Sequence, residues 1–191
     1  MPAELTTGFL VAAPSLGDPN FERAVVLLTA HKAEGSLGFV VNRPAPMTFR
    51  DVVDELGLSD KPDIPDIPVL SGGPVAPETG WVLFDPCASE TSDEDRDNVL
   101  TVSETIHIST SRDLLQDLAG RPDVERHMLL LGYAGWGAGQ LDEEIEQGVW
   151  IPADIDERVI FDTPHEERWD AALATLGIDP MWIVQMPTER S

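Results

Sequence analysis

The sequence predicts a single-domain α+β protein in which strands and helices are mixed without strict alternation. Three observations support this fold class. Short apolar runs bounded by turn residues predict strands, and segments with apolar residues at helical spacing behind capping residues predict helices. The length of 191 residues fits one domain, and no internal repeat or linker divides it. The predicted domain therefore covers residues 1–191.

Apolar or β-branched runs flanked by Gly, Pro, Asn or Asp are typical of strands. Residues 24–28 and 37–41 form two such runs, and a short turn containing Gly35 joins them, which predicts a hairpin. The strands expected in chain order lie at residues 8–13, 24–28, 37–41, 81–84, 99–102, 106–109, 128–131, 149–151 and 158–161. Residues 69–70 lead into a tight bend at 71–74. Polar or proline-rich loops are expected at residues 60–68 and 90–97.

The first helix is expected to begin after Thr48, with Asp51 completing a capping box, and to end at Gly57. Ser111 is the expected N-cap of a second helix that runs through Leu118. Residues 140–147 form a third.

The last predicted helix has signals at both ends. Thr163 is its expected N-cap, Pro164 fills the first position and Glu166 completes a capping box. Gly177 supplies the left-handed position that commonly follows a helix.

The charge of the chain argues against two classes of partner. There are 35 Asp and Glu against 12 Lys and Arg, which gives a formal net charge of -23. Nucleic acids and anionic membrane surfaces require a basic face, which this composition makes hard to assemble. We therefore expect no direct nucleic-acid binding and no membrane binding.

The N-terminal residues lack the features of a signal peptide, and the apolar run at residues 24–30 is too short to span a membrane. Cys87 is the only cysteine, so the chain cannot form an intramolecular disulfide, which is compatible with a reducing compartment. We expect a cytoplasmic protein. A reactive Cys87 thiol is disfavoured because no base or cation lies near it in sequence.

The most unusual segment is residues 131–144, which holds four glycines in eight residues between a predicted strand and a predicted helix. A phosphate-binding loop is disfavoured, because Gln140 stands where a dinucleotide fingerprint needs Gly or Ala and Ala138 where a Walker lysine is needed. Two interpretations remain open. We favour a tight backbone loop with Tyr133 and Trp136 packed over it; the other is a pocket lined by Tyr133, Trp136, Gln140 and Glu143.

Asn42 and Arg43 end a predicted strand and offer amide and guanidinium donors for an anionic ligand. The alternative, which we favour, is that Arg43 pairs with one of the many carboxylates. Ser71 precedes the turn Gly72-Gly73-Pro74, but no base is assigned to it by sequence, so we favour a structural turn.

We expect no metal and no cofactor. The acidic residues of the predicted helix at 140–147 lie at successive positions, which point in different directions, so they are expected to form a solvated face. The four histidines are scattered and form no pair at metal-binding spacing; they are His31, His107, His127 and His165.

Several ordered motifs resemble those of the AlgH/YqgE family of bacterial proteins. They span residues 8–178 and include Pro14-x-Leu16-x-Asp18-Pro19-x-Phe21-x-Arg23, Gly38-x-Val40-Val41-Asn42-Arg43-Pro44, Gly72-Gly73-Pro74-Val75, Ser111-Arg112-Asp113, Leu131-Gly132-Tyr133-Ala134-x-Trp136-x-x-Gly139-Gln140-Leu141 with Trp150, and Phe161-x-Thr163-Pro164 with Arg168-Trp169. The resemblance implies an α+β fold in which a bent, mixed or antiparallel sheet forms a pseudo-barrel flanked by helices. The family has no agreed biochemical activity; one branch carries the label of transcriptional regulator.

We therefore expect a non-enzymatic cytoplasmic protein that binds and regulates through an unidentified protein or small-molecule partner. Its expected ligand cleft combines the residues of three family-matching segments: Asn42, Arg43, Gly72, Gly73, Pro74, Tyr133, Trp136, Gln140 and Glu143. The alternative is an enzyme that acts on a small substrate in the same cleft, with Glu143 or Asp142 as the acid or base. Direct DNA binding is disfavoured by the charge.

Overall fold

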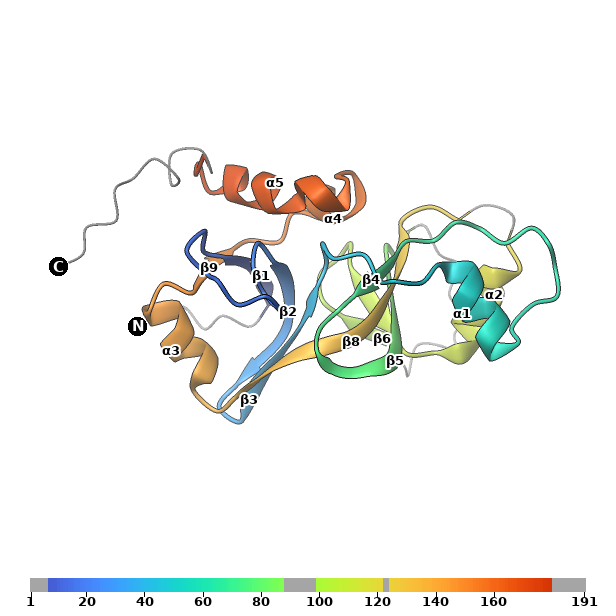
Figure 1. Ribbon diagram of the computed structural model, residues 1–191, viewed down its shortest axis with the longest axis horizontal. Helices are drawn as coiled ribbons and strands as arrows, with labels where there is room; N and C mark the ends of the chain where they lie inside the picture. The colour runs from blue at the N-terminus through green and yellow to red at the C-terminus, as the bar shows by residue number, and fades with distance from the viewer. Residues whose placement is uncertain (1–6, 88–98, 122–123, 180–191) are drawn as a thin grey trace. The chain divides into compact units, whose positions relative to one another are not determined.

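The computed structural model describes residues 7–87, 99–121 and 124–179 (Figure 1). The chain divides into two compact units. Unit 1 takes its described residues from Met1–Asn42 and Gly135–Ser191, and unit 2 is Arg43–Ala134. Strand β8 (His127–Gly137) contributes to both, because it passes from unit 2 into unit 1 at Gly135.

The sheet of unit 1 contains antiparallel strands in the order β3-β2-β1-β9, and β8 pairs with the outer side of β3. The predicted hairpin is confirmed as the β2–β3 pair. A register shift between Leu28 and Ala30 marks a bulge, which bends the strand locally. The strands are β1 (Gly8–Ala12), β2 (Val25–Lys32), β3 (Gly35–Val40) and β9 (Trp150–Ala153).

The helices of unit 1 correct one predicted strand. Residues 158–161, predicted as a strand, belong to helix α4 (Glu157–Phe161). The apolar run there is too short for its period to separate strand from helix, and the Asp156 carboxylate accepts a hydrogen bond from Arg158 N, which starts the helix. Helix α3 (Gln140–Glu146) agrees with its prediction.

The start of the last helix was also predicted wrongly. A 3₁₀ turn (His165–Glu167) precedes helix α5 (Arg168–Thr175), and neither has a side-chain cap. The Thr163 hydroxyl instead donates to the carbonyl of Arg158 at 2.8 Å, a contact with the preceding helix α4. The left-handed backbone of Gly177, with φ of 73°, is confirmed.

Helix α5 packs on β1 and β2 (Figure 1), and two adjacent residues at its start bind backbone carbonyls of unit 1. The buried Arg168 guanidinium donates to the carbonyls of Val41 and Thr163, and its burial lowers the pKa of Arg168 to about 10. Trp169 Nε1 donates to the carbonyl of Ala12 at 2.9 Å. Because the contacts with Val41 and Ala12 join distant parts of the sequence, they fix the helix on the sheet.

The sheet of unit 2 has the order β6-β7-β5-β8, with antiparallel neighbours, and β4 pairs parallel to β8. The predicted loop at 90–97 lies outside the described residues. The strands are β4 (Val69–Ser71), β5 (Val75–Phe84), β6 (Val99–Thr101), β7 (His107–Ser109) and the first part of β8.

Both predicted helices of unit 2 are confirmed. In α1 (Phe49–Leu56), Thr48 and Asp51 form the capping box, and hydrogen bonds from Thr48 lower the pKa of the Asp51 carboxyl. In α2 (Arg112–Ala119), the Ser111 hydroxyl oxygen accepts from Leu114 N. Apolar residues of both helices pack with the sheet in one buried core, which includes Phe49, Val53, Phe84, Leu114, Leu118 and Leu129.

Strand β8 overturns the favoured interpretation of the glycine-rich segment. Its residues up to Gly137 are strand, not loop, and only positions 138–139 separate the strand from α3. The prediction failed because backbone hydrogen bonds to neighbouring strands keep these glycines extended, and the side-chain pattern does not reveal such pairing. The fold class is α+β, with a bent, mainly antiparallel sheet and helices, as predicted. None of the helices in the described ranges has the length and hydropathy to cross a bilayer.

Candidate functional site

The predicted cleft residues of unit 2 meet at a close crossing of backbones. Gly72 N donates to the carbonyl of Leu131 at 2.7 Å. A Cβ on Gly73 would lie 2.2 Å from the carbonyl carbon and oxygen of Tyr133, so only glycine fits there. The carbonyl of Arg43 accepts from Ser71 N at 2.8 Å, which brings this segment alongside. The structure thus brings together Arg43, Gly72, Gly73 and Tyr133, and the exposed Pro74 follows the crossing.

Asn42 lies in unit 1, where its side chain binds backbone. Its Oδ1 accepts from Val25 N at 2.9 Å, and its Nδ2 donates to the carbonyl of Arg23 at 2.8 Å. Arg23 has a φ of 54°, an uncommon backbone conformation that this contact supports. The amide that was expected to face a ligand therefore stabilises the chain before β2.

Trp136 and Gln140 converge on Glu144 in unit 1. Trp136 Nε1 and Trp150 Nε1 each donate to Glu144 Oε2 at 2.9 Å, and Gln140 Nε2 donates to Glu144 Oε1 at 3.0 Å. Phe21 packs against both indoles, with ring centroids at 6.5 and 5.5 Å. The prediction that Glu144 belongs to a solvated face is therefore wrong. The available signal was that both of its indole partners stand in the family-like motifs, but their spacing from Glu144 did not indicate a contact.

The two carboxylates of the enzyme alternative are exposed. Glu143 faces solvent, and Asp142 Oδ1 lies 3.1 Å from His31 Nε2 with 63% of its side chain exposed. An acid with a raised pKa usually needs a buried carboxyl group. Neither residue has that environment.

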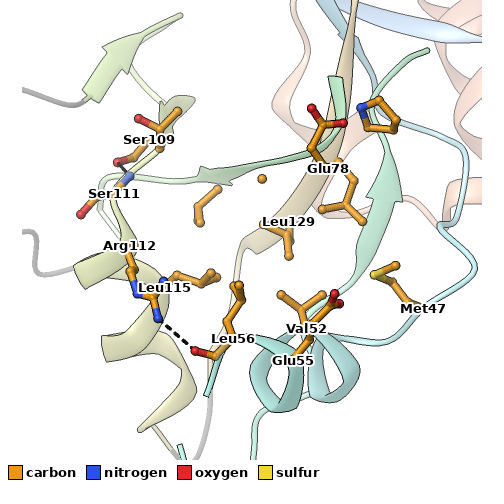
Figure 2. Close-up of a pocket in the computed structure, with 15 residues that line it drawn as sticks. Met47, Val52, Glu55, Leu56, Glu78, Ser109, Ser111, Arg112, Leu115 and Leu129 are labelled. Atoms are coloured by element: carbon orange, nitrogen blue, oxygen red, sulfur yellow. Dashed lines mark hydrogen bonds between the residues drawn. The ribbon is translucent and has the colours of Figure 1, made fainter. Parts of the chain in front are cut away.

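The structure reveals a pocket that the sequence did not predict. It has a volume of about 420 Å³ and lies within unit 2, between α1, α2 and the strands β5, β7 and β8 (Figure 2). Its walls are mostly aliphatic. The apolar lining includes Val52 and Leu56 from α1, Leu115 from α2, Val82 from β5, and Leu129 and Leu131 from β8.

Polar groups gather where β7 leads into α2. Ser111 N donates to Ser109 Oγ at 3.0 Å, and Leu114 N donates to Ser111 Oγ at 3.2 Å. Arg112 Nη2 donates to the carbonyl of Leu56 at 2.9 Å, which ties α2 to α1 across the pocket wall (Figure 2). The hydroxyls and the guanidinium therefore lie at one end of the apolar lining.

A bulge of four residues in β5 forms another wall of the pocket. Val75 pairs with Tyr133 and Gly80 pairs with Leu131, so residues 76–79 face a single residue of β8, Gly132. Gly132 has a φ of 75°, and a Cβ there would lie 3.0 Å from the carbonyl oxygen of Val75. The bulge contributes Pro77 and Glu78 to the pocket lining. The glycines of this family-like motif thus allow the backbone path that forms the wall.

One sequence signal pointed to this pocket. Ser111-Arg112-Asp113 matched a family-like motif, but the prediction used it only as a helix start. No spacing rule connects it with α1 or with the bulge, because these segments are far apart in the chain. In the part of the chain that the structure describes, no group of three or more His, Cys, Asp or Glu is placed to hold a metal ion. Cys87 is exposed, and its N–H donates to Asp85 Oδ1 at 2.9 Å.

The chain is similar to proteins from several bacteria. A family model described as AlgH-like matches residues 9–181. A UPF0301 protein of Anaeromyxobacter dehalogenans is 43% identical over 184 residues, which cover 94% of this chain and 91% of that protein. A UPF0301 protein of Paracoccus denitrificans is 41% identical and covers 95% and 94%.

Two solved structures have a similar fold. The solution structure of the AlgH protein from Pseudomonas aeruginosa is 34% identical, with a TM-score of 0.75 and coverage of 100% of this chain and 98% of that chain. The crystal structure of protein DIP2367 from Corynebacterium diphtheriae has a TM-score of 0.68 at 22% identity, covers 96% and 88%, and bears on the fold alone. The family match runs through both units of the chain. This protein belongs to the AlgH-like family.

Proposed function

We propose that this protein is a non-enzymatic, cytoplasmic binding protein with a regulatory role, and that it takes a small molecule into the pocket of unit 2. The pocket itself is the observation that carries the proposal. Its volume of about 420 Å³ falls in the range of small-molecule sites. A mainly aliphatic lining with a few polar groups at one end is the usual composition of such sites.

Binding is favoured over catalysis by how the polar groups are used. The hydroxyl oxygens of Ser109 and Ser111 both accept hydrogen bonds from backbone N–H groups, which is a turn and capping role. The enzyme alternative is also weakened because Glu143, its candidate acid or base, is exposed.

A regulatory role would then operate through the occupied pocket and a protein partner. The net charge of -23 opposes direct contact with DNA, so regulation by DNA binding is the least favoured route. One part of the predicted cleft is retained as a candidate contact surface for that partner. It is the backbone crossing of Gly72 and Gly73 with Tyr133, which has Arg43 beside it and lies in the same unit as the pocket.

A thermal-shift screen of small organic molecules tests the proposal. Gly80 lines the pocket without a left-handed φ, and a Cβ there would lie 3.4 Å from the flexible Leu129 Cδ1, so Gly80→Leu fills the pocket with little backbone strain. Gly17→Leu is the matched control because nothing lies within 4 Å of a Cβ at that position. Compounds that raise the Tm should lose their effect in Gly80→Leu and keep it in Gly17→Leu. Equal responses in both variants, or no stabilising compound, would reject the pocket as the site.

A further inference from the structure

The charged residues of the pocket indicate the charge of its ligand. Arg112 lines the pocket, and within the described ranges its guanidinium has no carboxylate at ion-pairing distance. By contrast, Arg121 pairs with Asp117 and Arg126 pairs with Asp85. Although the chain has 35 acidic and 12 basic residues, no carboxylate of the described residues neutralises the charge of Arg112 in such a pair. This charge is therefore available to an anionic ligand.

The guanidinium is also held in place. Its bond to the carbonyl of Leu56 uses one of the five N–H donors of an arginine and restrains the side chain at the pocket wall. Donors that are already oriented can bind a carboxylate through two parallel hydrogen bonds with less loss of conformational entropy. Ser109, which is 1% exposed, and Thr110 place hydroxyls at the same end of the pocket.

The other lining residues limit the negative charge that a ligand can carry and favour a ligand with an apolar body. Glu78 lies across the pocket from Arg112 (Figure 2), and Glu55 on α1 also contributes to the lining. Two carboxylates in the same pocket, in a chain of net charge -23, repel a phosphate dianion about twice as strongly as a monoanion, and the single guanidinium of Arg112 balances one negative charge. The aliphatic walls, including the 40% exposed Leu56, favour an apolar body.

From this arrangement, and resting on the proposed function, we propose that the pocket binds an amphipathic monocarboxylate: its carboxylate contacts Arg112 and its apolar body lies along α1, α2 and β8. Thr110 and Ser109 contribute hydrogen bonds at the carboxylate end. The apolar body buries Leu56 and Leu115. Affinity therefore has two separable parts, one from the apolar walls and one from the guanidinium.

Calorimetric titration of the full chain with octanoate, octanol and octylammonium separates these parts. Octanoate should bind most tightly. Arg112→Gln should weaken octanoate about ten-fold, because a hydrogen bond to a charged group is lost, and leave octanol within about two-fold. Arg50→Gln is the matched control, since Arg50 also donates to a carbonyl, that of Pro62, but does not line the pocket. Arg112→Lys, which keeps the charge, should retain part of the affinity and checks that the loss is not one of folding.

The outcomes distinguish the ligand class from the site. If octanol and octylammonium bind as well as octanoate, Arg112→Gln has no effect, and Gly80→Leu abolishes binding, the monocarboxylate assignment is wrong and the pocket remains the site. If none of the three probes binds, the monocarboxylate assignment is also wrong, and a thermal-shift screen without stabilising compounds would then remove the site as well. Octanoate affinity that falls with ionic strength while octanol affinity does not would support the assignment independently of any substitution.

Discussion

Replacing Glu144 by Ala should lower the free energy of unfolding of unit 1 by more than the substitution of a fully exposed helical residue does. The Glu144 carboxylate accepts from the indoles of Trp136 and Trp150 and from the Gln140 amide, and the two indoles are 6% and 2% exposed. Each buried donor left without an acceptor costs about 1–3 kcal/mol. Because Glu144 itself is half-buried, water can reach part of the vacated site, so we expect a net loss of about 2–4 kcal/mol for the pair of indoles.

Urea denaturation followed by tryptophan fluorescence measures this loss. The matched control is Glu143→Ala, the exposed neighbour on the same helix, which should change the free energy of unfolding by less than about 0.5 kcal/mol. Glu144→Gln keeps one side-chain oxygen as acceptor and should fall between the two. Equal losses for Glu144→Ala and Glu143→Ala would refute the role assigned to the indole–carboxylate contacts.

Three further predictions address other residues that the sequence singled out. Gly73→Ala should cost about 2 kcal/mol or more in urea denaturation, because its Cβ would lie 2.2 Å from the backbone of Tyr133, whereas Gly17→Ala should be near neutral; a tolerated Gly73→Ala would contradict the close crossing. Asn42→Ala should cost about 1–3 kcal/mol because it leaves the buried N–H of Val25 without an acceptor, and Asn42→Asp, which retains that acceptor, should cost less; equal losses would show that the acceptor is not what matters. Burial lowers the pKa of His127, so the neutral form is favoured in the folded state, and the stability that it contributes is present above about pH 6.5 and is lost as the pH falls below that value. His127→Phe should therefore show a smaller loss of Tm than the unsubstituted protein between about pH 7 and 5, and parallel curves would exclude this contribution.

Local signals in the sequence predicted the elements that are determined locally. The capping residues Thr48 and Ser111 located the starts of α1 and α2, because a cap bonds to backbone groups only three residues away. The hairpin of β2 and β3 followed from two apolar runs and a short turn. These features need no knowledge of the rest of the chain.

Predictions failed where distant contacts decide the structure. The glycines of β8 suggested a loop, but pairing with β3 and β5 keeps the segment extended. In β8, tertiary pairing outweighs a local preference of about 1 kcal/mol. The failure at Thr163 is local: its hydroxyl donates to the carbonyl of Arg158, which lies five residues earlier in the chain.

The candidate site was predicted less well than the fold. Family-like motifs identified Asn42, Gly73 and Trp136, and the structure gives each a packing or hydrogen-bonding role. The pocket instead depends on the approach of α1 to α2 and on the bulge of β5, which no sequence pattern here encodes. Arg112 was recognised only as part of a motif. That no carboxylate of residues 7–87, 99–121 or 124–179 lies at ion-pairing distance from it is visible only in three dimensions.

The most direct test of the central claim is to map amide chemical shifts by NMR while octanoate is added to the full chain. The proposed site predicts that the largest saturable changes fall on pocket residues, among them Gly80, Ser109, Arg112 and Leu129, and that they disappear in Gly80→Leu. Changes confined to residues 135–147 of unit 1, or no saturable change anywhere, would contradict the assignment of the unit 2 pocket as the site that binds a monocarboxylate.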